Sequence, residues 1–260
     1  MSTLDVLRGA GMATVFLTRI RLPTGAYAGR GAARWAIAWF PLVGGAIGAM
    51  LAAAWRALDA LPAFPAAVLV IILSLLLTGA LHEDGLADSA DALGGATSRE
   101  RIFEILKDSR IGSYGGLALV SSVMLRVSVL ATMQRNVAIA LVLSHALGRT
   151  SAAVIGGVLP YVTPPAASRS APLLSGGRPP AFVAGFVMVA ILAASTALSS
   201  VSLSHAAALL GVGVALTLLS GTYFVARVGG TTGDLLGAAE QIAECGVLVA
   251  CALLFGGVSL

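Results

Sequence analysis

The acidic residues of this chain are concentrated in one short segment. Residues 82–91 hold four carboxylates, although the whole chain has only 12. If Asp84 opens a helix, Asp88 and Asp91 follow at i+4 and i+7 and share one face with it. Carboxylates this close repel one another, and a hard divalent cation such as Mg²⁺ would hold them together. The spacing therefore predicts a magnesium site that serves a phosphate-bearing substrate.

A second polar segment, Lys107–Gly115, is predicted at the mouth of a membrane span. It contains the two cations Lys107 and Arg110, the acid Asp108, two serines and the glycine Gly112. Cations beside glycines suit a phosphate, because they supply charge and leave room for backbone N–H groups to approach. A positively charged turn at the membrane edge is the alternative interpretation.

A glycine-rich segment, residues 229–240, contains Gly230, Thr232, Gly233 and Asp234. It resembles a phosphate-cradling loop but lacks the ending of a P-loop. Taken alone, a flexible turn explains it equally well. The functional interpretation gains weight because this segment and the acidic segment are predicted on the same face of the membrane.

Ionisable residues also occur inside the predicted spans. Glu240 and Glu244 stand four residues apart and share a helical face, as do His145 and Arg149. An ionisable group within a membrane is a functional candidate by default. For Arg149, a structural pair or a side chain that reaches the membrane surface is the alternative.

The sequence does not assign one role to Arg126 or to His82. Arg126 lies in the middle of a span without an obvious partner, which favours a structural role. His82 stands beside the carboxylates, where it could act as a general base, support another ligand or lie on the surface.

The composition defines the class of protein. Hydrophobic residues make up 58% of the 260 residues and charged residues only 11%, and the mean hydropathy is +0.94. Soluble domains average about 25% charged residues, so the chain is predicted to be an integral membrane protein. The net charge of +4 favours anchoring beside anionic headgroups. Because no basic cluster is interleaved with aromatic residues, nucleic-acid binding is not expected.

The hydropathy pattern predicts an all-α, polytopic bundle that forms a single membrane domain over residues 1–260. Its catalytic loops are expected at about 82–114 and 227–240. Leu4–Thr18 is expected to be a helix on the membrane surface, and Ser98 is expected to cap a short amphipathic helix. Seven segments are long and apolar enough to span the membrane: about 36–57, 62–81, 115–133, 136–159, 181–199, 206–226 and 241–259.

Basic residues orient these spans. With seven spans, 12 Lys and Arg residues fall on the N-terminal side and only two, Arg56 and Arg135, on the other. The side richer in basic residues is normally cytoplasmic. The N-terminus and the acidic segment are therefore predicted in the cytoplasm.

At these residues the chain resembles the cobalamin synthase family, also called adenosylcobinamide-GDP ribazoletransferases. The resemblance covers nearly the whole chain in order, spacing and hydropathy. It rests on His82–Asp88, Asp91 and Lys107–Gly112, on the block from Gly229 to Glu244, and on an N-terminal Phe-Leu-Thr-Arg-Ile run. Arg21 and Leu22 before Pro23 depart from the family's opening, as does Ala92, where glycine is common.

The resemblance implies a Mg²⁺-dependent enzyme of the bacterial cytoplasmic (inner) membrane. It would join α-ribazole, or its 5′-phosphate, to adenosylcobinamide-GDP and release GMP. Within that reaction Asp84, Asp88, Asp108 and His82 are the expected catalytic residues. The expected metal ligands are Glu83, Asp84, Asp88, Asp91 and Asp234. The expected substrate-binding residues are Lys107, Arg110, Gly112, Arg149, Gly230, Thr232, Gly233, Glu240 and Glu244.

Two alternatives remain. A CDP-alcohol phosphatidyltransferase also repeats aspartates at helical spacing, but the arginine expected soon after its Asp-Gly pair is absent here. A cation-coupled transporter would place its carboxylates near the middle of the bilayer in repeated halves, and no repeat is evident. Glycine- and alanine-rich helix faces are compatible with a homo-oligomer.

Overall fold

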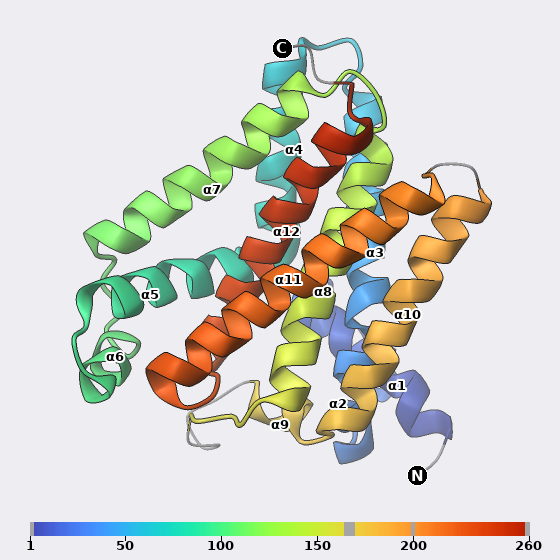
Figure 1. The fold of residues 1–260 in the computed structure, drawn as a ribbon. Coiled ribbons are helices and arrows are strands. Elements are labelled where there is room, and N and C mark those ends of the chain that lie inside the picture. Colours follow the sequence, from blue (N-terminus) through green and yellow to red (C-terminus); the bar gives the residue numbers. More distant parts are fainter. Residues whose placement is uncertain (1–2, 164–169, 199–200, 258–260) are drawn as a thin grey trace.

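The structure is a computed structural model that describes residues 3–163, 170–198 and 201–257. Within these ranges the chain is helical, and its one β pairing is an isolated parallel bridge between Tyr161 and Thr231. Figure 1 shows an elongated bundle of tilted helices. In order, the helices are α1 (Thr3–Leu17), η1 (Thr24–Ala26), α2 (Arg30–Trp35), η2 (Ala36–Trp39), α3 (Phe40–Ala57), α4 (Ala63–Thr78), α5 (Leu81–Gly95), α6 (Arg99–Ile105), α7 (Ser113–Thr132), α8 (Val137–Val158), α9 (Ala171–Leu174), α10 (Arg178–Ala197), α11 (Leu203–Val228) and α12 (Gly233–Phe255).

Six stretches of helix in the described ranges are long and apolar enough to cross a membrane on their own. They are residues 30–57, which run from α2 through α3, and helices α7, α8, α10, α11 and α12. Helix α4 reaches the required length only together with α5, and the two are bent by 91°. The prediction of about seven spans in an all-α fold is therefore confirmed. The segment predicted as the span 62–81 is shorter than expected, because α4 ends at Thr78.

Helix α8 lies at the centre of the bundle, where it packs against α3, α10, α11 and α12. Glycines allow α3 to approach it closely. A Cβ atom at Gly44 or Gly48 would lie 2.4 Å from the carbonyl oxygen of His145 or Leu141, respectively. Small residues at helix crossings favour association in lipid, because backbones can then approach and pack.

The break between α4 and α5 turns the acidic segment out of the bundle axis. Gly79 and Ala80 both adopt the left-handed conformation, with φ of 69° and 55°. This conformation suits glycine and is uncommon for alanine, so the two residues end α4 sharply. Helix α5 then runs sideways from the foot of α4 (Figure 1). The acidic segment is thus a helix, as the spacing of its aspartates predicts, within the stretch 82–114 that was expected to form a catalytic loop.

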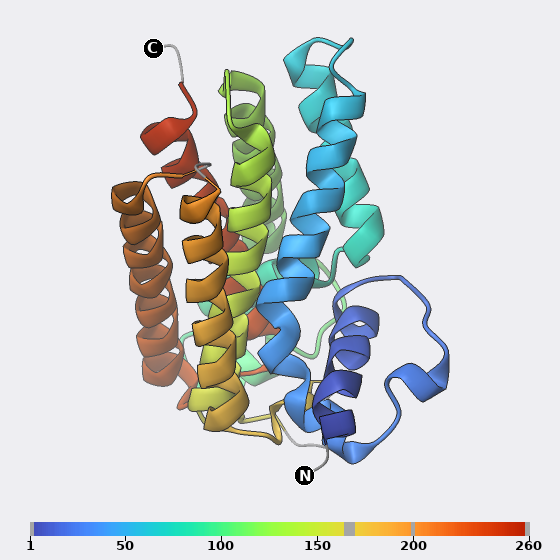
Figure 2. The ribbon, with the colours of Figure 1, turned by 90° about the vertical axis from the view of Figure 1, so that its right-hand side faces the viewer.

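The remaining short helices lie at the same end of the bundle. Helix α1, the predicted surface helix, packs at the foot of α3 (Figure 2). Helix α6 begins as predicted at Ser98, whose hydroxyl accepts a hydrogen bond from the backbone N–H of Arg101 at 3.2 Å. The described start of the chain and the end of α12 lie at opposite ends of the bundle, which agrees with an odd number of crossings.

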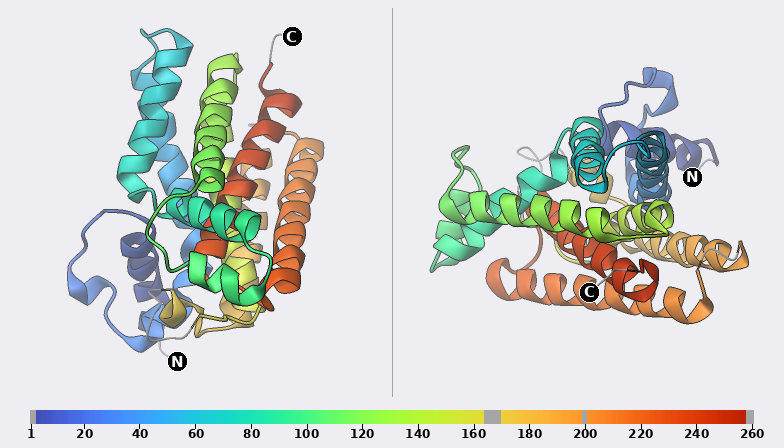
Figure 3. Two further views of the ribbon diagram at one scale, coloured as in Figure 1. Left: turned by 90° about the vertical axis from the view of Figure 1, so that its left-hand side faces the viewer. Right: turned by 90° about the horizontal axis from the view of Figure 1, so that it is seen from above.

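Helix α5 crosses α12 at two glycines. A Cβ atom on Gly85 would lie 2.8 Å from the carbonyl oxygen of Asp234 and 3.1 Å from the Cα atom of Gly237. A Cβ atom on Gly237 would lie 3.2 Å from the Cα atom of Gly85. The two helices therefore touch backbone to backbone, as the side view of Figure 3 shows for α5 in front of the start of α12.

Adding a side chain at this crossing should loosen the bundle. We expect Gly85→Ala to destabilise the protein by about 1–3 kcal/mol, because the new methyl group meets backbone atoms that cannot move aside. Its thermal unfolding midpoint in detergent should fall. Gly116→Ala in α7 is the matched control, because a Cβ there meets nothing within 4 Å. Equal midpoints for the two variants would contradict the tight crossing.

Candidate active site

The crossing of α5 over α12 brings three aspartates together. Asp84 and Asp88 project from α5, and Asp234 stands in the first turn of α12. Asp88 is half-buried and is exposed to the negative charge of Asp84, Asp234 and Asp91. In the described ranges, no Lys, Arg or His side chain forms an ion pair with Asp84, Asp88 or Asp234. These three aspartates, which we call the acid cluster, thus carry uncompensated negative charge.

The other two predicted metal ligands are engaged elsewhere. Both carboxylate oxygens of Asp91 accept hydrogen bonds from the start of α7, one from the N–H of Gly112 at 2.7 Å and one from the N–H of Gly115 at 2.9 Å. This places a carboxylate at a helix N-terminus, where it is favoured. Glu83 turns inward to Arg126, 3.0 Å away. No three His, Cys, Asp or Glu side chains of the described segments stand close enough together to form a complete metal site.

Behind the acid cluster lies a buried ionic network that joins α5, α7, α8 and α12. Arg126 pairs with Glu83 and with Glu244, at 3.0 and 3.3 Å. Arg149 pairs with both Glu240 and Glu244, and His145 Nδ1 lies 2.9 Å from Glu244. All of these side chains are at most 6% exposed. Arg126 therefore has the partners that its sequence context did not reveal.

This network separates three predicted substrate-binding residues from solvent. Glu240, Glu244 and Arg149 are essentially inaccessible and line neither of the two cavities that border the acid cluster. Their common function in the structure is to hold four helices in register. His82 is the exception within the network: its Nδ1 lies 3.4 Å from Glu240 Oε2, and the residue also lines a cavity.

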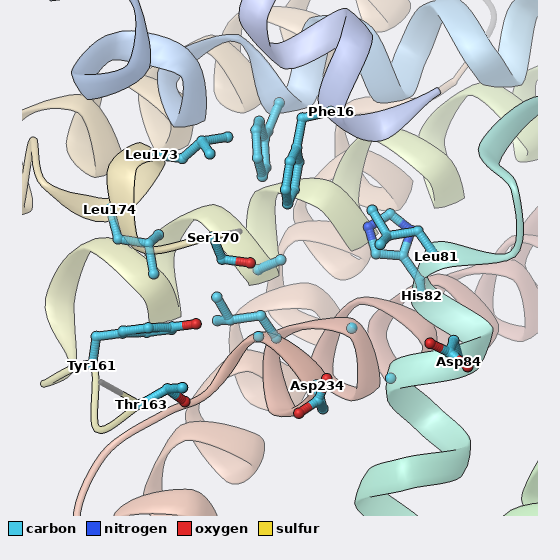
Figure 4. Close-up of a pocket in the computed structure, with 16 residues that line it drawn as sticks. Phe16, Leu81, His82, Asp84, Tyr161, Thr163, Ser170, Leu173, Leu174 and Asp234 are labelled. Atoms are coloured by element: carbon cyan, nitrogen blue, oxygen red, sulfur yellow. The ribbon is translucent and has the colours of Figure 1, made fainter. Parts of the chain in front are cut away.

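The first cavity has a volume of about 330 Å³ and is apolar at one end and acidic at the other (Figure 4). Its apolar end includes Phe16 and Phe40, whose rings are stacked with centroids 6.0 Å apart. Its other end includes His82, Asp84 and Asp234. Such a cavity suits a ligand with a flat apolar part and a polar part.

A second cavity, of about 620 Å³, is also lined by Asp84. The acids Glu83, Asp84 and Asp88 line it, together with Arg19 from the segment after α1 and Ser109 from the loop between α6 and α7. Asp84, Phe16 and Leu81 line both cavities. The acid cluster therefore stands at the boundary between two spaces, where two ligands could meet.

The loop between α6 and α7 borders the second cavity. Two of its charged side chains, Arg110 and Asp108, pair with each other. Arg110 donates hydrogen bonds to both carboxylate oxygens of Asp108, at 3.0 and 2.6 Å. These bonds hold the pKa of the exposed Asp108 carboxyl at about 2. A carboxylate with so low a pKa is a weak general base. Lys107 is exposed and forms no ion pair with a described residue.

The glycine-rich segment mainly positions α12. The N–H of Thr231 donates to the carbonyl of Pro160 at 2.8 Å, and a Cβ atom on Gly230 would lie 2.2 Å from that same oxygen. The Thr232 hydroxyl caps α12 by accepting from the N–H of Leu235 at 3.2 Å. Among Gly230, Thr232 and Gly233, which are predicted to bind substrate, only Gly233 lines the first cavity, where it stands next to the predicted metal ligand Asp234.

Several lining residues escaped the sequence analysis. The first cavity also contains residues from the segment before α10, among them Tyr161, Ser170 and Leu173. Aromatic and apolar residues in a membrane protein give no local signal of a cavity, because most of them face lipid or the core. Arg19 belongs to the N-terminal Phe-Leu-Thr-Arg-Ile run that supports the family resemblance, but the sequence alone assigns it no place in the site.

These features define a multi-pass membrane protein with an acidic site between two helices at one end of its bundle. The family description "Cobalamin-5-phosphate synthase" matches residues 9–252. A protein from Shewanella amazonensis named adenosylcobinamide-GDP ribazoletransferase is 39% identical, with 94% of each chain covered. Proteins of the same name from Mesorhizobium japonicum and Azorhizobium caulinodans are 37% and 40% identical, covering 96% and 94% of this chain and 94% and 95% of theirs.

The chain therefore belongs to the cobalamin-5-phosphate synthase family. No solved structure matches it. The family membership confirms the resemblance found in the sequence, and it favours an adenosylcobinamide-GDP ribazoletransferase over either alternative, the phosphatidyltransferase or the transporter.

Removing one cation from the buried network should lower the free energy of unfolding. We expect Arg126→Met to destabilise the protein by about 3–5 kcal/mol, because Glu83 is left buried without its partner. The thermal unfolding midpoint in detergent measures this loss. Arg101→Gln is the control, because its ion pair with Glu104 is 61% and 63% exposed and should contribute at most about 1 kcal/mol. A midpoint for Arg126→Met as high as that of Arg101→Gln would refute the structural role of the network.

Proposed function

We propose that this chain transfers the corrinoid-linked phosphoryl group of adenosylcobinamide-GDP to α-ribazole or its 5′-phosphate at the acid cluster. A ribazole hydroxyl oxygen forms a bond to the phosphorus nearer the corrinoid. The bond from that phosphorus to the GMP oxygen breaks, and GMP leaves. The single observation that carries this proposal is the position of Asp84 on the boundary between an apolar, aromatic cavity and an open, acidic one.

The two cavities match the two substrates. The first has stacked aromatic rings at one end and would take the flat base of the ribazole. The second is larger and lies beside the loop that carries Lys107, so it would take the nucleotide end of adenosylcobinamide-GDP. The bulky corrinoid would remain outside, since the two cavities measure only about 330 and 620 Å³.

The acid cluster fits a magnesium ion. Asp84, Asp88 and Asp234 are hard oxygen donors, and no described cation neutralises them. Mg²⁺ usually keeps several waters and is held by one or two carboxylates plus substrate phosphates. A complete protein cage is therefore not required. When bound, the ion would neutralise charge that develops on the phosphoryl oxygens.

In this proposal His82 accepts the proton of the attacking hydroxyl. Its Nδ1 faces Glu240 at 3.4 Å, and the residue lines the first cavity. The contact with Glu240 is too poorly aligned to be a hydrogen bond, so it does not fix which ring nitrogen carries the hydrogen; in the neutral imidazole the other nitrogen is the acceptor. Asp108 is less suited to this step, because its pair with Arg110 keeps its pKa near 2.

The site is proposed to face the cytoplasm of a bacterial inner membrane. The basic residues of the loops lie predominantly at the end of the bundle that carries α5 and α6. Nucleotide substrates and Mg²⁺ are available on that side.

The reconstituted reaction tests this function. Purified protein in detergent, supplied with adenosylcobinamide-GDP, α-ribazole phosphate and Mg²⁺, should yield cobamide and GMP in equal amounts. We expect Asp88→Asn to lower turnover by at least about 100-fold, because a charge that acts in the transition state is lost. Asp59→Asn is the control, since Asp59 is exposed in the turn between α3 and α4.

Removal of Mg²⁺ with a chelator should abolish turnover, and added Mg²⁺ should restore it. Near-normal product formation by Asp88→Asn, or by the metal-free protein, would refute the proposed role of the acid cluster.

A further inference from the structure

Arg19 is a cation in the second cavity without an assigned role. It follows the end of α1 and lines that cavity together with Asp84, Asp88 and Ser109. No carboxylate of the described residues lies within ion-pair distance of it. The cavity therefore presents a guanidinium and a pair of carboxylates that do not touch each other.

The backbone around Arg19 is fixed. Its N–H donates a 2.7 Å hydrogen bond to the carbonyl of Leu77 in the last turn of α4. The hydroxyl of the preceding Thr18 donates to Thr14 at 2.7 Å and accepts from the N–H of Ile20 at 3.1 Å. The segment after α1 is thus tied to the foot of α4 through main-chain contacts that a side-chain substitution at Arg19 leaves in place.

Gly79 makes room for the Arg19 side chain. A Cβ atom on Gly79 would lie 2.2 Å from Arg19 Nε and 3.0 Å from Nη2. The φ of 69° at Gly79 also disfavours any other residue there. The glycine that turns α5 out of the bundle therefore also leaves space for this guanidinium in the wall of the second cavity.

A ligand that satisfies both ends of this cavity needs negatively charged oxygens for the guanidinium and oxygens that share a metal ion with the aspartates. A pyrophosphate linkage has both, and arginine suits phosphate because its planar fork donates two parallel hydrogen bonds. We propose that Arg19 binds the pyrophosphate of the nucleoside-diphosphate substrate, across the second cavity from Asp84 and Asp88. The assignment of this substrate to the second cavity rests on the proposed function.

Substrate kinetics separate binding from a structural role. Arg19→Gln should raise the KM for adenosylcobinamide-GDP by about 10- to 100-fold, the loss expected for a hydrogen bond to a charged group. The KM for α-ribazole phosphate should stay the same, and Arg19→Lys should recover part of the loss. Arg21→Gln is the matched control: it removes the same charge two residues away, from an exposed position outside both cavities.

Equilibrium binding keeps this test independent of turnover. Titration of the detergent-solubilised protein with GDP and Mg²⁺ should show about tenfold or more weaker binding for Arg19→Gln than for Arg21→Gln. If Arg19→Gln binds GDP more weakly than Arg21→Gln but the unmodified protein has no transferase activity, the Arg19 proposal is supported and the proposed function is refuted. If the transferase is active but Arg19→Gln and Arg21→Gln bind GDP equally, the Arg19 proposal is overturned. An equal rise of both KM values would also overturn it, because it would indicate a structural role.

Discussion

Helices α5 and α12 cross with their backbones in contact, and the candidate site exists only because of this crossing. Gly85 and Gly237 let the two backbones touch, and this contact brings Asp234 beside the aspartates of α5. Without it, the acidic segment would be a charged helix at the membrane edge, and the two cavities lined by Asp84 would not meet. The left-handed turn at Gly79 is the second requirement, because it directs α5 across α12 instead of along α4.

The buried ionic network explains how this crossing is held in an apolar bundle. Arg126 and Arg149 link acids of α5 and α12 to each other and to α7 and α8. Charges in a low-dielectric interior are costly unless they are paired, so each pair fixes the helices that supply it. The same network keeps Glu240 beside His82. The charged residues inside the bundle thus orient the side chains that line the cavities.

The sequence predicted the fold class, and the helical position of the acidic residues, because both leave strong local signals. Apolar runs located the spans, and helical spacing placed Asp84 and Asp88 on one face. The pairing of Arg126 with Glu83 and Glu244 was not predictable, because it depends on how three distant helices pack. The same limit applies to the aromatic cavity: Phe16 is ordinary in a membrane helix until tertiary contacts place it opposite His82.

Whether Asp84 of α5 and Asp234 of α12 bind the same metal ion can be measured with a double-mutant cycle on the Mg²⁺ dependence of turnover. Asp84→Asn and Asp234→Asn should each raise the half-saturating Mg²⁺ concentration by about tenfold or more. If both residues hold one ion, the double variant should be little worse than the poorer single variant, because residues that share a partner are not additive. Two effects that simply multiply in the double variant would show that the carboxylates act independently and would contradict a shared site.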